Sequence, residues 1–293
     1  MYDAYMRGPV LVTGASGNVG SLVLQGLVGA GVAVRAADVD PARVRARFPD
    51  VPVVRFDFTD PAMWTAAFAD VAVMFLMRPP QLANIARDMV PALEAGRAAG
   101  VEHTVLLSLQ GAEHNRVVPH AKIEAWLRAS GRGWSFVRPS FFVENLSGVH
   151  APDIRERDRI VVPAGRGATA FVAAGDVAAV AVAALSDPAG HRDRAWTPTG
   201  PAALTSAQVA EVLSAELGRP IRYTRPGALR YAAHALRALG MPAPMVAVTT
   251  AIYTVARLGR AGGLTDDVQR VTGRPPLGFT GWAHQHREAW ARP

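Results

Sequence analysis

Short apolar runs and amphipathic stretches alternate along the first half of the chain. Pro9–Val12 is an apolar run that ends at Thr13-Gly14, and Val19–Val28 carries apolar residues at helical spacing. This pattern predicts a strand that leads into a helix. The alternation continues through predicted strands at 32–37, 53–56, 71–77, 104–108 and 134–137 and predicted helices at 41–48, 61–68, 81–99 and 120–130. Such alternation is typical of a doubly wound α/β fold, in which helices cover both faces of a parallel sheet and ligands bind at the carboxyl ends of the strands.

The second half has a less regular pattern. Residues 171–185, with a helix start at Gly175-Asp176, and a short strand at 195–197 are predicted to return to the parallel sheet. We therefore expect a core of residues 1–147, with returns near 168–187 and 194–199, and a small α+β substrate part within 148–293. Thr205-Ser206 opens a predicted helix that ends before Gly218.

The longest later apolar run, Met245–Ala256, is too short to cross a bilayer and predicts a buried helix. Its apolar residues and those before it would roof a hydrophobic pocket, although ordinary core packing explains them as well: Tyr231, Ala235, Leu239, Met245, Val248, Ile252 and Tyr253.

Composition narrows the class of protein. The chain has 293 residues, half of them hydrophobic and 19% charged, as in globular proteins. The absence of cysteine excludes a disulfide framework, a thiolate nucleophile and a Cys-based metal site. The amino end lacks the long apolar region of a signal peptide, so we expect a cytoplasmic protein without a membrane partner. The net charge of +7 is carried by scattered arginines without a basic block, so an anionic small ligand explains it as well as nucleic acid does.

The first predicted turn has the composition of a dinucleotide-binding loop. Its glycines are spaced GxxGxxG between the first strand and the first helix: the first permits a tight turn, the second lets backbone approach a pyrophosphate, and the third allows close packing of helix on strand. The residues expected to bind a dinucleotide here are Gly14, Ser16, Gly17, Asn18, Val19 and Gly20.

Acidic residues follow the second and third predicted strands. Asp38 has the spacing at which a carboxylate accepts hydrogen bonds from the adenosine ribose, which favours NAD over NADP, although Arg35 and Arg43 lie close by. Its alternative role is a cap before Pro41. Asp57, with Phe58, would lie beside the adenine or serve a turn. Met77-Arg78 after the fourth strand would line the path of the dinucleotide.

Four segments together resemble the NmrA-like group of atypical short-chain dehydrogenases/reductases, especially its NAD(P)H-dependent quinone oxidoreductase branch: VTGASGNVG, RFDFTD, HAKIEAWLRASGRGWSFVRPSFFVENL and GGLTDDVQRVTGRPPLGF. The resemblance spans nearly the whole chain. It implies a Rossmann core, a small carboxyl-terminal substrate part and a nicotinamide cofactor. The family also includes members that bind dinucleotide as redox sensors.

Two departures from related patterns matter. Ordinary short-chain dehydrogenases carry Tyr-x-x-x-Lys, and if Glu124 is matched to the glutamate that follows that lysine, the lysine's place falls to His120 and the tyrosine's to Arg116. The usual acid is then missing. Val39 stands where NmrA-like relatives often have an arginine suited to a 2′-phosphate, which agrees with the preference for NAD.

The candidate catalytic residues are His120, Lys122 and Ser108. His120 can hold the nicotinamide ribose or pass a proton to a reduced oxygen, or it is a helix-capping or exposed histidine. Lys122, the chain's single lysine, is turned away from His120 toward the face of Trp126, where a solvated position is favoured. If the helix leans over the cofactor, Lys122 reaches a ribose hydroxyl or the substrate oxygen instead. Ser108 ends the fifth predicted strand and faces the nicotinamide or caps a turn.

The need for a proton donor during reduction limits the class of substrate. A ketone reduced to an alkoxide needs a positioned proton donor, whereas a quinone accepts hydride to give a stabilised phenolate that water protonates. We therefore predict hydride transfer from NAD(P)H to a quinone or an extended aromatic or polyketide-like carbonyl compound. The cleft wall would include Phe141, Phe142 and Asn145.

The alternatives are a catalytically silent dinucleotide sensor that acts through a protein partner, and an isomerase or epimerase with bound dinucleotide. We expect a monomer or a homodimer. The residues 206–239 imitate a helix-turn-helix, but the connection is too long for DNA binding. His284-x-His286 lacks a carboxylate cluster, so no metal site is expected.

Overall fold

Seven parallel strands form the central sheet of the first of two structural units. The computed structural model describes residues 8–292 and divides them into one unit up to Pro139 with Ala174–Pro198 and Asp267–Gly273, and a second unit of Ser140–Ala173, Thr199–Asp266 and the segment from Arg274. The sheet order is β10-β6-β5-β4-β1-β2-β3. This order, with a reversal beside β1, is that of a doubly wound Rossmann fold, and it confirms the predicted class.

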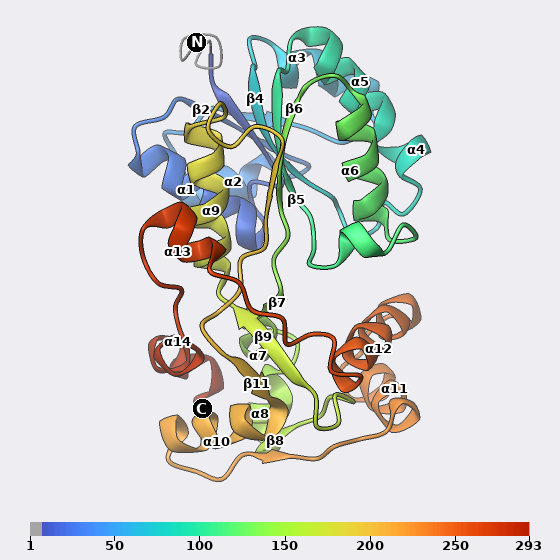
Figure 1. The fold of residues 1–293 in the computed structure, drawn as a ribbon, viewed down its shortest axis with the longest axis vertical. Coiled ribbons are helices and arrows are strands. Elements are labelled where there is room, and N and C mark those ends of the chain that lie inside the picture. Colours follow the sequence, from blue (N-terminus) through green and yellow to red (C-terminus); the bar gives the residue numbers. More distant parts are fainter. Residues whose placement is uncertain (1–7, 293) are drawn as a thin grey trace. The chain divides into compact units, whose positions relative to one another are not determined.

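The strands of the first unit are β1 (Val10–Thr13), β2 (Val34–Asp38), β3 (Val53–Arg55), β4 (Val73–Met77), β5 (His103–Leu107), β6 (Gly133–Val137) and β10 (Arg194–Trp196). Its helices are α1 (Asn18–Gly29), α2 (Pro41–Arg47), η2 (Pro61–Met63), α3 (Trp64–Phe68), α4 (Ile85–Asp88), α5 (Val90–Ala99), η3 (Ala112–His114), α6 (Pro119–Ala129), α9 (Ala174–Ser186) and α13 (Asp267–Thr272). Helices α1 and α9 pack together on one face of the sheet, and α3, α5 and α6 lie on the other (Figure 1).

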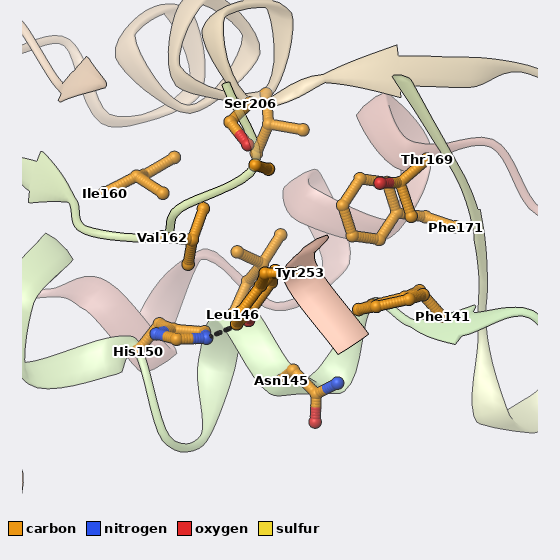
Figure 2. Close-up of a pocket in the computed structure, with 12 residues that line it drawn as sticks. Phe141, Asn145, Leu146, His150, Ile160, Val162, Thr169, Phe171, Ser206 and Tyr253 are labelled. Carbon is orange, nitrogen blue, oxygen red and sulfur yellow. Dashed lines mark hydrogen bonds between the residues drawn. The ribbon is translucent and has the colours of Figure 1, made fainter. Parts of the chain in front are cut away.

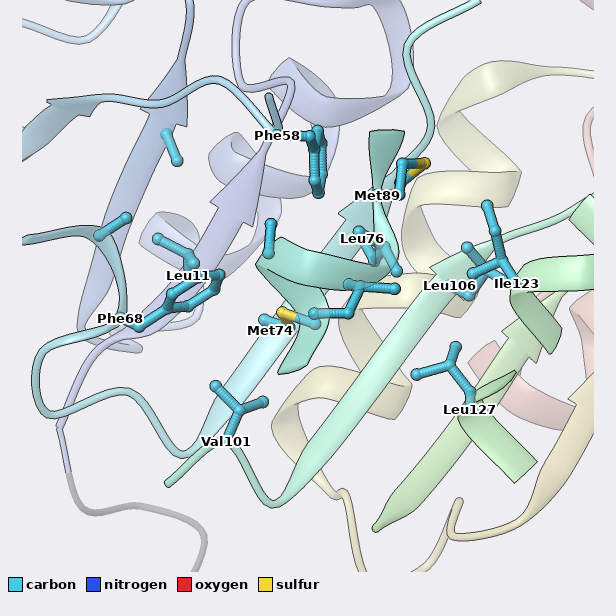
Figure 3. Packing of buried hydrophobic residues seen from close by; sticks show 14 of the residues in the cluster. Leu11, Phe58, Phe68, Met74, Leu76, Met89, Val101, Leu106, Ile123 and Leu127 are labelled. Carbon is cyan, nitrogen blue, oxygen red and sulfur yellow. The ribbon is translucent and has the colours of Figure 1, made fainter. Parts of the chain in front are cut away.

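A continuous apolar cluster joins the sheet to the second of these faces. Leu11, Met74, Leu76 and Leu106 from the strands meet Phe68, Ile123 and Leu127 from the helices and Met89 from the turn between α4 and α5 (Figure 3). All are nearly inaccessible to solvent. Burial of such side chains stabilises each by about 1.5–3 kcal/mol relative to exposure. The alternating pattern of the sequence therefore forms the layers that it predicts.

The predicted helix 81–99 is wrong in two respects. Residues 81–84 are not helical, and the remainder is two helices, α4 and α5. Asn84 caps α4, since its side chain accepts the N–H of Arg87 (3.3 Å). Pro91 in the first turn of α5 has no N–H to continue the hydrogen bonds of α4, so the chain breaks at Met89, whose φ is −125°.

The second unit contains two small sheets. Its strands are β7 (Phe141–Phe142), β8 (Arg159–Ile160), β9 (Ala168–Val172), β11 (Ala203–Thr205) and β12 (Arg222–Tyr223), in the orders β11-β9-β7 and β12-β8. Its helices are α7 (Glu144–Ser147), α8 (Ala151–Arg157), α10 (Ser206–Leu217), α11 (Ala228–Arg237), α12 (Ala243–Arg257), α14 (Phe279–Gln285) and η4 (Arg287–Trp290). The predicted caps of α10 are confirmed: Thr205 and Gln208 form a capping box and Gly218 is left-handed.

Only part of the predicted segment 171–185 returns to the first unit. The segment β9 pairs with β7 and β11 in the second unit, and only α9, from Ala174, returns to the first. Strand β10 joins the parallel sheet beside β6, as predicted. The observed boundary lies at Pro139/Ser140, and Asp267–Gly273 belongs to the first unit because α13 packs on α9.

The prediction of a buried helix at Met245–Ala256 is wrong. In α12 only Val246 and Ala256 are buried, and they pack with Tyr231, Ala235 and Met241 or with the main core of the second unit. The other large apolar side chains of α12 are exposed: Met245, Val248, Ile252 and Val255. Among residues 8–292, no helix is both long and apolar enough to cross a membrane.

The carboxyl end of α12 rests on a glycine loop. A Cβ added at Gly167 would lie 1.8 Å from the carbonyl oxygen of Ala256, and this obstacle is backbone. A Cβ added at Gly175 would meet nothing within 4 Å. Helix α12 therefore reaches its position only because residue 167 has no side chain.

We predict that Gly167→Ala lowers the free energy of unfolding by about 1–3 kcal/mol, because the loop and α12 must separate. Gly175→Ala, the matched control in α9, should change it by less than about 1 kcal/mol. Urea unfolding monitored by circular dichroism measures both. Equal stability of the two variants would show that α12 does not pack as described.

Candidate functional site

The glycine turn joins β1 to α1 and has a geometry that side chains would obstruct. Gly14 has φ +62°, in the left-handed region. Gly17 is the N-cap of α1, and its N–H donates to the carbonyl oxygen of Gly14 (2.9 Å). A Cβ at Gly20 would lie 2.1 Å from that oxygen. The three glycines thus bring the first turn of α1, beginning at Asn18 and the buried Val19, directly to the carboxyl end of β1. That is where a helix amino end attracts a phosphate.

The carboxylate of Asp38 is buried beside this turn. Its Oδ2 accepts the backbone N–H of Ser16 (2.8 Å) and its Oδ1 accepts that of Asp40 (3.0 Å). The alternative role as the helix cap belongs to Asp40, whose Oδ1 accepts the N–H of Ala42 (3.1 Å). The geometry therefore places a carboxylate against the glycine turn.

The arginines near Asp38 differ in their contacts. Arg35 directs Nη1 to the carbonyl oxygens of Ala67 and Ala69, at the end of α3. Those bonds hold its guanidinium away from the glycine turn. Arg43 is exposed on α2.

Asp57 and Phe58 have structural contacts. Oδ1 of Asp57 accepts both the N–H (2.8 Å) and the hydroxyl (2.7 Å) of Thr59, which is a turn-capping arrangement. Phe58 is buried in the core (Figure 3). Their predicted place beside an adenine stays a prediction.

Met77 packs directly over the glycine turn. A Cβ at Gly14 would lie 2.1 Å from its Cε, so the two residues are in close contact. The backbone N–H of Met77 donates to the Thr13 hydroxyl (2.9 Å), which in turn donates to the carbonyl oxygen of Phe75 (3.0 Å). This chain of bonds fixes the carboxyl ends of β1 and β4 to each other. Arg78 continues from β4 and donates to the carbonyl oxygens of Pro79, Pro80 and Leu82.

His120 lies at the start of α6 in a largely buried position. Burial, followed by the positive charge of Arg78, lowers the pKa of His120 to about 4, while Glu124 acts in the opposite direction. Its imidazole is therefore neutral at physiological pH. Nδ1 is buried and has no hydrogen-bond partner within residues 8–292. A neutral ring with an unused nitrogen is suited to bind a hydroxyl group or a carbonyl oxygen.

Ser108 and Glu124 belong to a buried ionic cluster. Arg138 holds the carboxylate of Glu124 through two bonds, Nε to Oε1 (2.9 Å) and Nη2 to Oε2 (2.6 Å), and the Ser108 hydroxyl donates to Oε1 (2.7 Å). Although burial acts to lower the pKa of Arg138, its bonds to Glu124 raise it. Because the Ser108 hydroxyl proton points to Glu124, the geometry favours a positioning role for Ser108 over its predicted contact with a nicotinamide.

Lys122 is exposed on α6, as the solvated alternative predicts. No described hydrogen bond or ion pair joins it to His120. Its predicted reach to a cofactor or a substrate stays a prediction.

The second unit has its own pocket, which is largely apolar (Figure 2). Its space measures ≈ 390 Å³ including the open mouth, but only ≈ 20 Å³ of it is free to the centre of a water molecule. A substrate would therefore occupy the open part or displace side chains. Two of the predicted substrate residues line it, Phe141 and Asn145, whereas Phe142 does not, because neighbouring residues of a strand point to opposite faces. The other lining residues are Leu146, His150, Ile160, Val162, Ala164, Thr169, Phe171, Ser206, Val209 and Tyr253.

One polar pair lies among these apolar side chains. Nε2 of His150 and the Tyr253 hydroxyl are 2.5 Å apart (Figure 2). Burial lowers the pKa of His150 to about 4 and raises that of Tyr253, so both side chains are neutral. Of the residues predicted to roof a pocket, only Tyr253 lines this one; Tyr231 packs behind it, edge to face at 5.6 Å.

Sequence reasoning missed His150, which is 103 residues from its partner. It also missed the buried carboxylate Asp153, three residues further, which pairs with His234, Arg157 and Arg159. The sequence offers no local signal for the pairing of His150 with Tyr253 or of Asp153 with His234. In the described part of the chain, no three His, Asp or Glu side chains are grouped as a metal ion would require. His284 instead contacts Glu216 (3.1 Å), and His286 stacks on Trp282.

The chain is similar to known oxidoreductases in sequence and in structure. A model of the NmrA-like family matches residues 6–257. The chain is 34% identical to an NAD(P)H azoreductase of Xenophilus azovorans, over 96% of this chain and 99% of the relative. It is 35% identical to the (4-alkanoyl-5-oxo-2,5-dihydrofuran-3-yl)methyl phosphate reductase of Streptomyces griseus, with the same two coverages. The solved structure of an NADPH-dependent quinone oxidoreductase of Escherichia coli, complexed with NADPH, superposes with a TM-score of 0.86 at 25% identity, over 95% of this chain and 99% of that one.

Three buried histidines make stability depend on pH. Burial lowers the pKa values of His103, His120 and His150 to about 4. The unfolded chain binds these protons below about 6.5, and the folded chain only below about 4. The free energy of unfolding is therefore highest above pH 6.5 and falls as the pH drops from there toward 4, by up to about 1.4 kcal/mol per pH unit for each histidine.

We predict that His150→Phe reduces this slope, because one proton fewer is taken up on unfolding. Leu229→Gln, at an exposed position without a titratable group, should leave the slope unchanged. Urea unfolding at pH 7.5, 6 and 5 measures the slopes. An identical slope in His150→Phe and the unsubstituted protein would contradict the buried, neutral state of His150.

Proposed function

This chain belongs to the NmrA-like family, and from that premise we propose that it is an NAD(P)H-dependent oxidoreductase that transfers a hydride to a quinone or another extended conjugated carbonyl compound. The observation that carries the proposal is the glycine turn of the first unit. A Cβ at Gly14 or Gly17 would meet the thioether of Met77, and a Cβ at Gly20 would meet the carbonyl oxygen of Gly14, so the three glycines keep the turn compact at the amino end of a helix of twelve residues. This compact turn, the cradle, fits the pyrophosphate of a dinucleotide.

The relatives support the class of acceptor. Their names describe reduction of an azo compound, of an alkanoyl-oxo-dihydrofuran and of a quinone. In each of these acceptors the reacting group is part of a conjugated system, so the charge that arrives with a hydride is delocalised. Delocalisation reduces the need for a strong proton donor at the reacting atom. This chain has no Tyr-x-x-x-Lys, since its single lysine is preceded by Val118 at the fourth position.

The nicotinamide of the bound cofactor would supply the hydride. The chain's own residues would bind and orient the reactants. Backbone N–H groups at the start of α1 would hold the phosphates, and Met77 would limit the depth of the cradle. His120, neutral and with a buried unused Nδ1, would bind a ribose hydroxyl or deliver a proton to the reduced oxygen.

The pocket of the second unit is the proposed site for the acceptor. Phe141, Phe171 and Tyr253 provide flat apolar walls, as an aromatic ring requires. If Nε2 of His150 carries the proton, it donates to the Tyr253 oxygen, and the phenol proton is left to donate to a ligand. This tautomer is the favourable one, because Nδ1 of His150 is buried without a partner, and an unmet N–H there would cost more than an unmet acceptor. Tyr253 would then bind a carbonyl oxygen of the acceptor.

Asp38 supports NADH as the preferred cofactor. Its carboxylate is fixed beside the glycine turn by Ser16, and Arg35, the nearest candidate for a 2′-phosphate, is bound to carbonyl oxygens of α3. A carboxylate accepts hydrogen bonds from a ribose 2′-hydroxyl and repels a 2′-phosphate.

The test of the function is oxidation of NADH and NADPH, followed at 340 nm, with 1,4-naphthoquinone and with a simple aromatic ketone. We expect reduction of the quinone and much slower reduction of the ketone. His120→Ala should lower kcat/KM for the quinone at least about tenfold, whereas His114→Ala, on the exposed η3, should not change it. Dinucleotide binding without turnover of any acceptor would favour the alternative, a silent sensor.

The cofactor preference has a separate test. Asp38→Ser should raise the Kd for NADH and lower the ratio of the NADPH Kd to the NADH Kd by about tenfold, because the repulsion of a 2′-phosphate is removed. Asp40→Ser removes the same charge two residues away and should leave that ratio unchanged. Titrations that follow nicotinamide fluorescence measure both constants. An unaltered ratio in Asp38→Ser would reject the assigned role of Asp38.

A further inference from the structure

The excess positive charge of the chain is concentrated in one segment. Residues 217–265 contain seven arginines and no Asp, Glu or Lys, and outside this segment basic and acidic residues are equal in number, 24 each. The segment includes the whole of α11 and α12. The net charge of +7 is therefore a local property of the second unit, where the apolar pocket lies. A local excess of one sign attracts ligands of the opposite sign.

One of these arginines adjoins the pocket. Arg257 lies four residues after Tyr253 on α12, hence on the same side of the helix, one turn away. Its stem packs over Gly165, where an added Cβ would lie 3.1 Å from its Cγ, and Gly165 follows the pocket residue Ala164. The guanidinium is exposed, and within residues 8–292 no acidic side chain pairs with it. Arg166, also exposed, is the next residue of the same loop.

The position of Arg257 is fixed by backbone. Gly167 lies so close to the carbonyl oxygen of Ala256 that no side chain fits between them, and the N–H of Ala170 donates to the carbonyl oxygen of Ala261 (2.8 Å) just beyond the helix. The end of α12 is thus held on both sides against the loop that forms the pocket wall. A guanidinium presented from a fixed helix end can bind a planar or tetrahedral anion with two bonds.

The apolar surface beside this charge is the pocket wall. Phe141, Phe171 and Tyr253 line the pocket, and Tyr253 shares its side of α12 with Arg257. Apolar side chains next to an unpaired arginine match a ligand that is itself apolar at one end and anionic at the other. A neutral or cationic aromatic compound would form no ion pair with Arg257.

We propose that the acceptor bound by this pocket is an amphiphilic anion, a conjugated apolar body that carries a sulfonate, carboxylate or phosphate group, and that Arg257, assisted by Arg166, binds its anionic group. The proposal rests on the function proposed above and names its substrate class. The apolar body contacts Phe141, Phe171 and Tyr253, and the anion lies at the loop 164–167.

The test compares two ligands of nearly equal shape that undergo no reduction, naphthalene-2-sulfonate and its neutral sulfonamide. Calorimetric titration of the full chain should give a Kd for the sulfonate at least about tenfold lower than that for the sulfonamide, and the difference should shrink in high salt. Arg257→Gln should raise the Kd of the sulfonate about tenfold and leave that of the sulfonamide within about twofold. Arg257→Lys should retain part of the preference.

The control is Arg287→Gln, which removes the same charge from η4 of the second unit, none of whose residues lines the pocket. It should leave both constants unchanged. Equal Kd values for the two ligands, or an equal loss in Arg287→Gln and Arg257→Gln, would overturn the proposal. An unchanged sulfonamide Kd in Arg257→Gln shows that the variant is folded.

Turnover separates this inference from the function on which it rests. If 1,4-naphthoquinone is reduced while the sulfonate and the sulfonamide bind equally, the reductase assignment stands and the anion site fails. If the sulfonate binds selectively through Arg257 and no acceptor is reduced, the site stands and the reductase assignment fails.

Discussion

The contact between Gly20 and Gly14 is the constraint on which the rest of the molecule's chemistry depends. The first turn of α1 lies so near the loop before it that a single methyl group at residue 20 would stand 2.1 Å from a carbonyl oxygen. Because of this contact, the amino end of α1 and the carboxyl end of β1 meet at one point, to which Asp38 adds its carboxylate through Ser16 and Met77 its thioether. We propose that the resulting cradle binds a dinucleotide's phosphates and that the carboxylate binds the adjoining ribose.

The proposed chemistry follows from the absence of a Tyr-x-x-x-Lys motif and from the neutral side chains of His120 and Tyr253. The chain has no Tyr-x-x-x-Lys, and the Ser108 hydroxyl donates to Glu124. Burial keeps two side chains uncharged, the imidazole of His120 in the first unit and the phenol of Tyr253 in the second. Such groups bind oxygen atoms well and protonate a localised alkoxide poorly. A conjugated acceptor, whose reduced form is stabilised by delocalisation, matches these residues.

The sequence predicts the first unit better than the second, for a physical reason. The strands and helices of the parallel sheet are adjacent in sequence, so hydrophobic periodicity and the turn at Gly14 are sufficient to place them. The exceptions are local, such as Pro91, which divides one expected helix into two. In the second unit the decisive contacts are distant: Asp153 meets His234 across 81 residues, and His150 meets Tyr253 across 103. Composition predicted α12 to be buried because it is apolar, but burial is decided by which elements pack against it. Likewise, Phe141 lines the pocket and Phe142 does not, a difference set by strand register.

Binding of the reduced dinucleotide tests the central claim most directly. Isothermal titration calorimetry with NADH and the full chain should show one site per chain, with weaker binding of NADPH. Absence of binding for NADH, NADPH and their oxidised forms alike would contradict the account. It would show that the cradle formed by Gly14, Gly17 and Gly20 does not bind a dinucleotide.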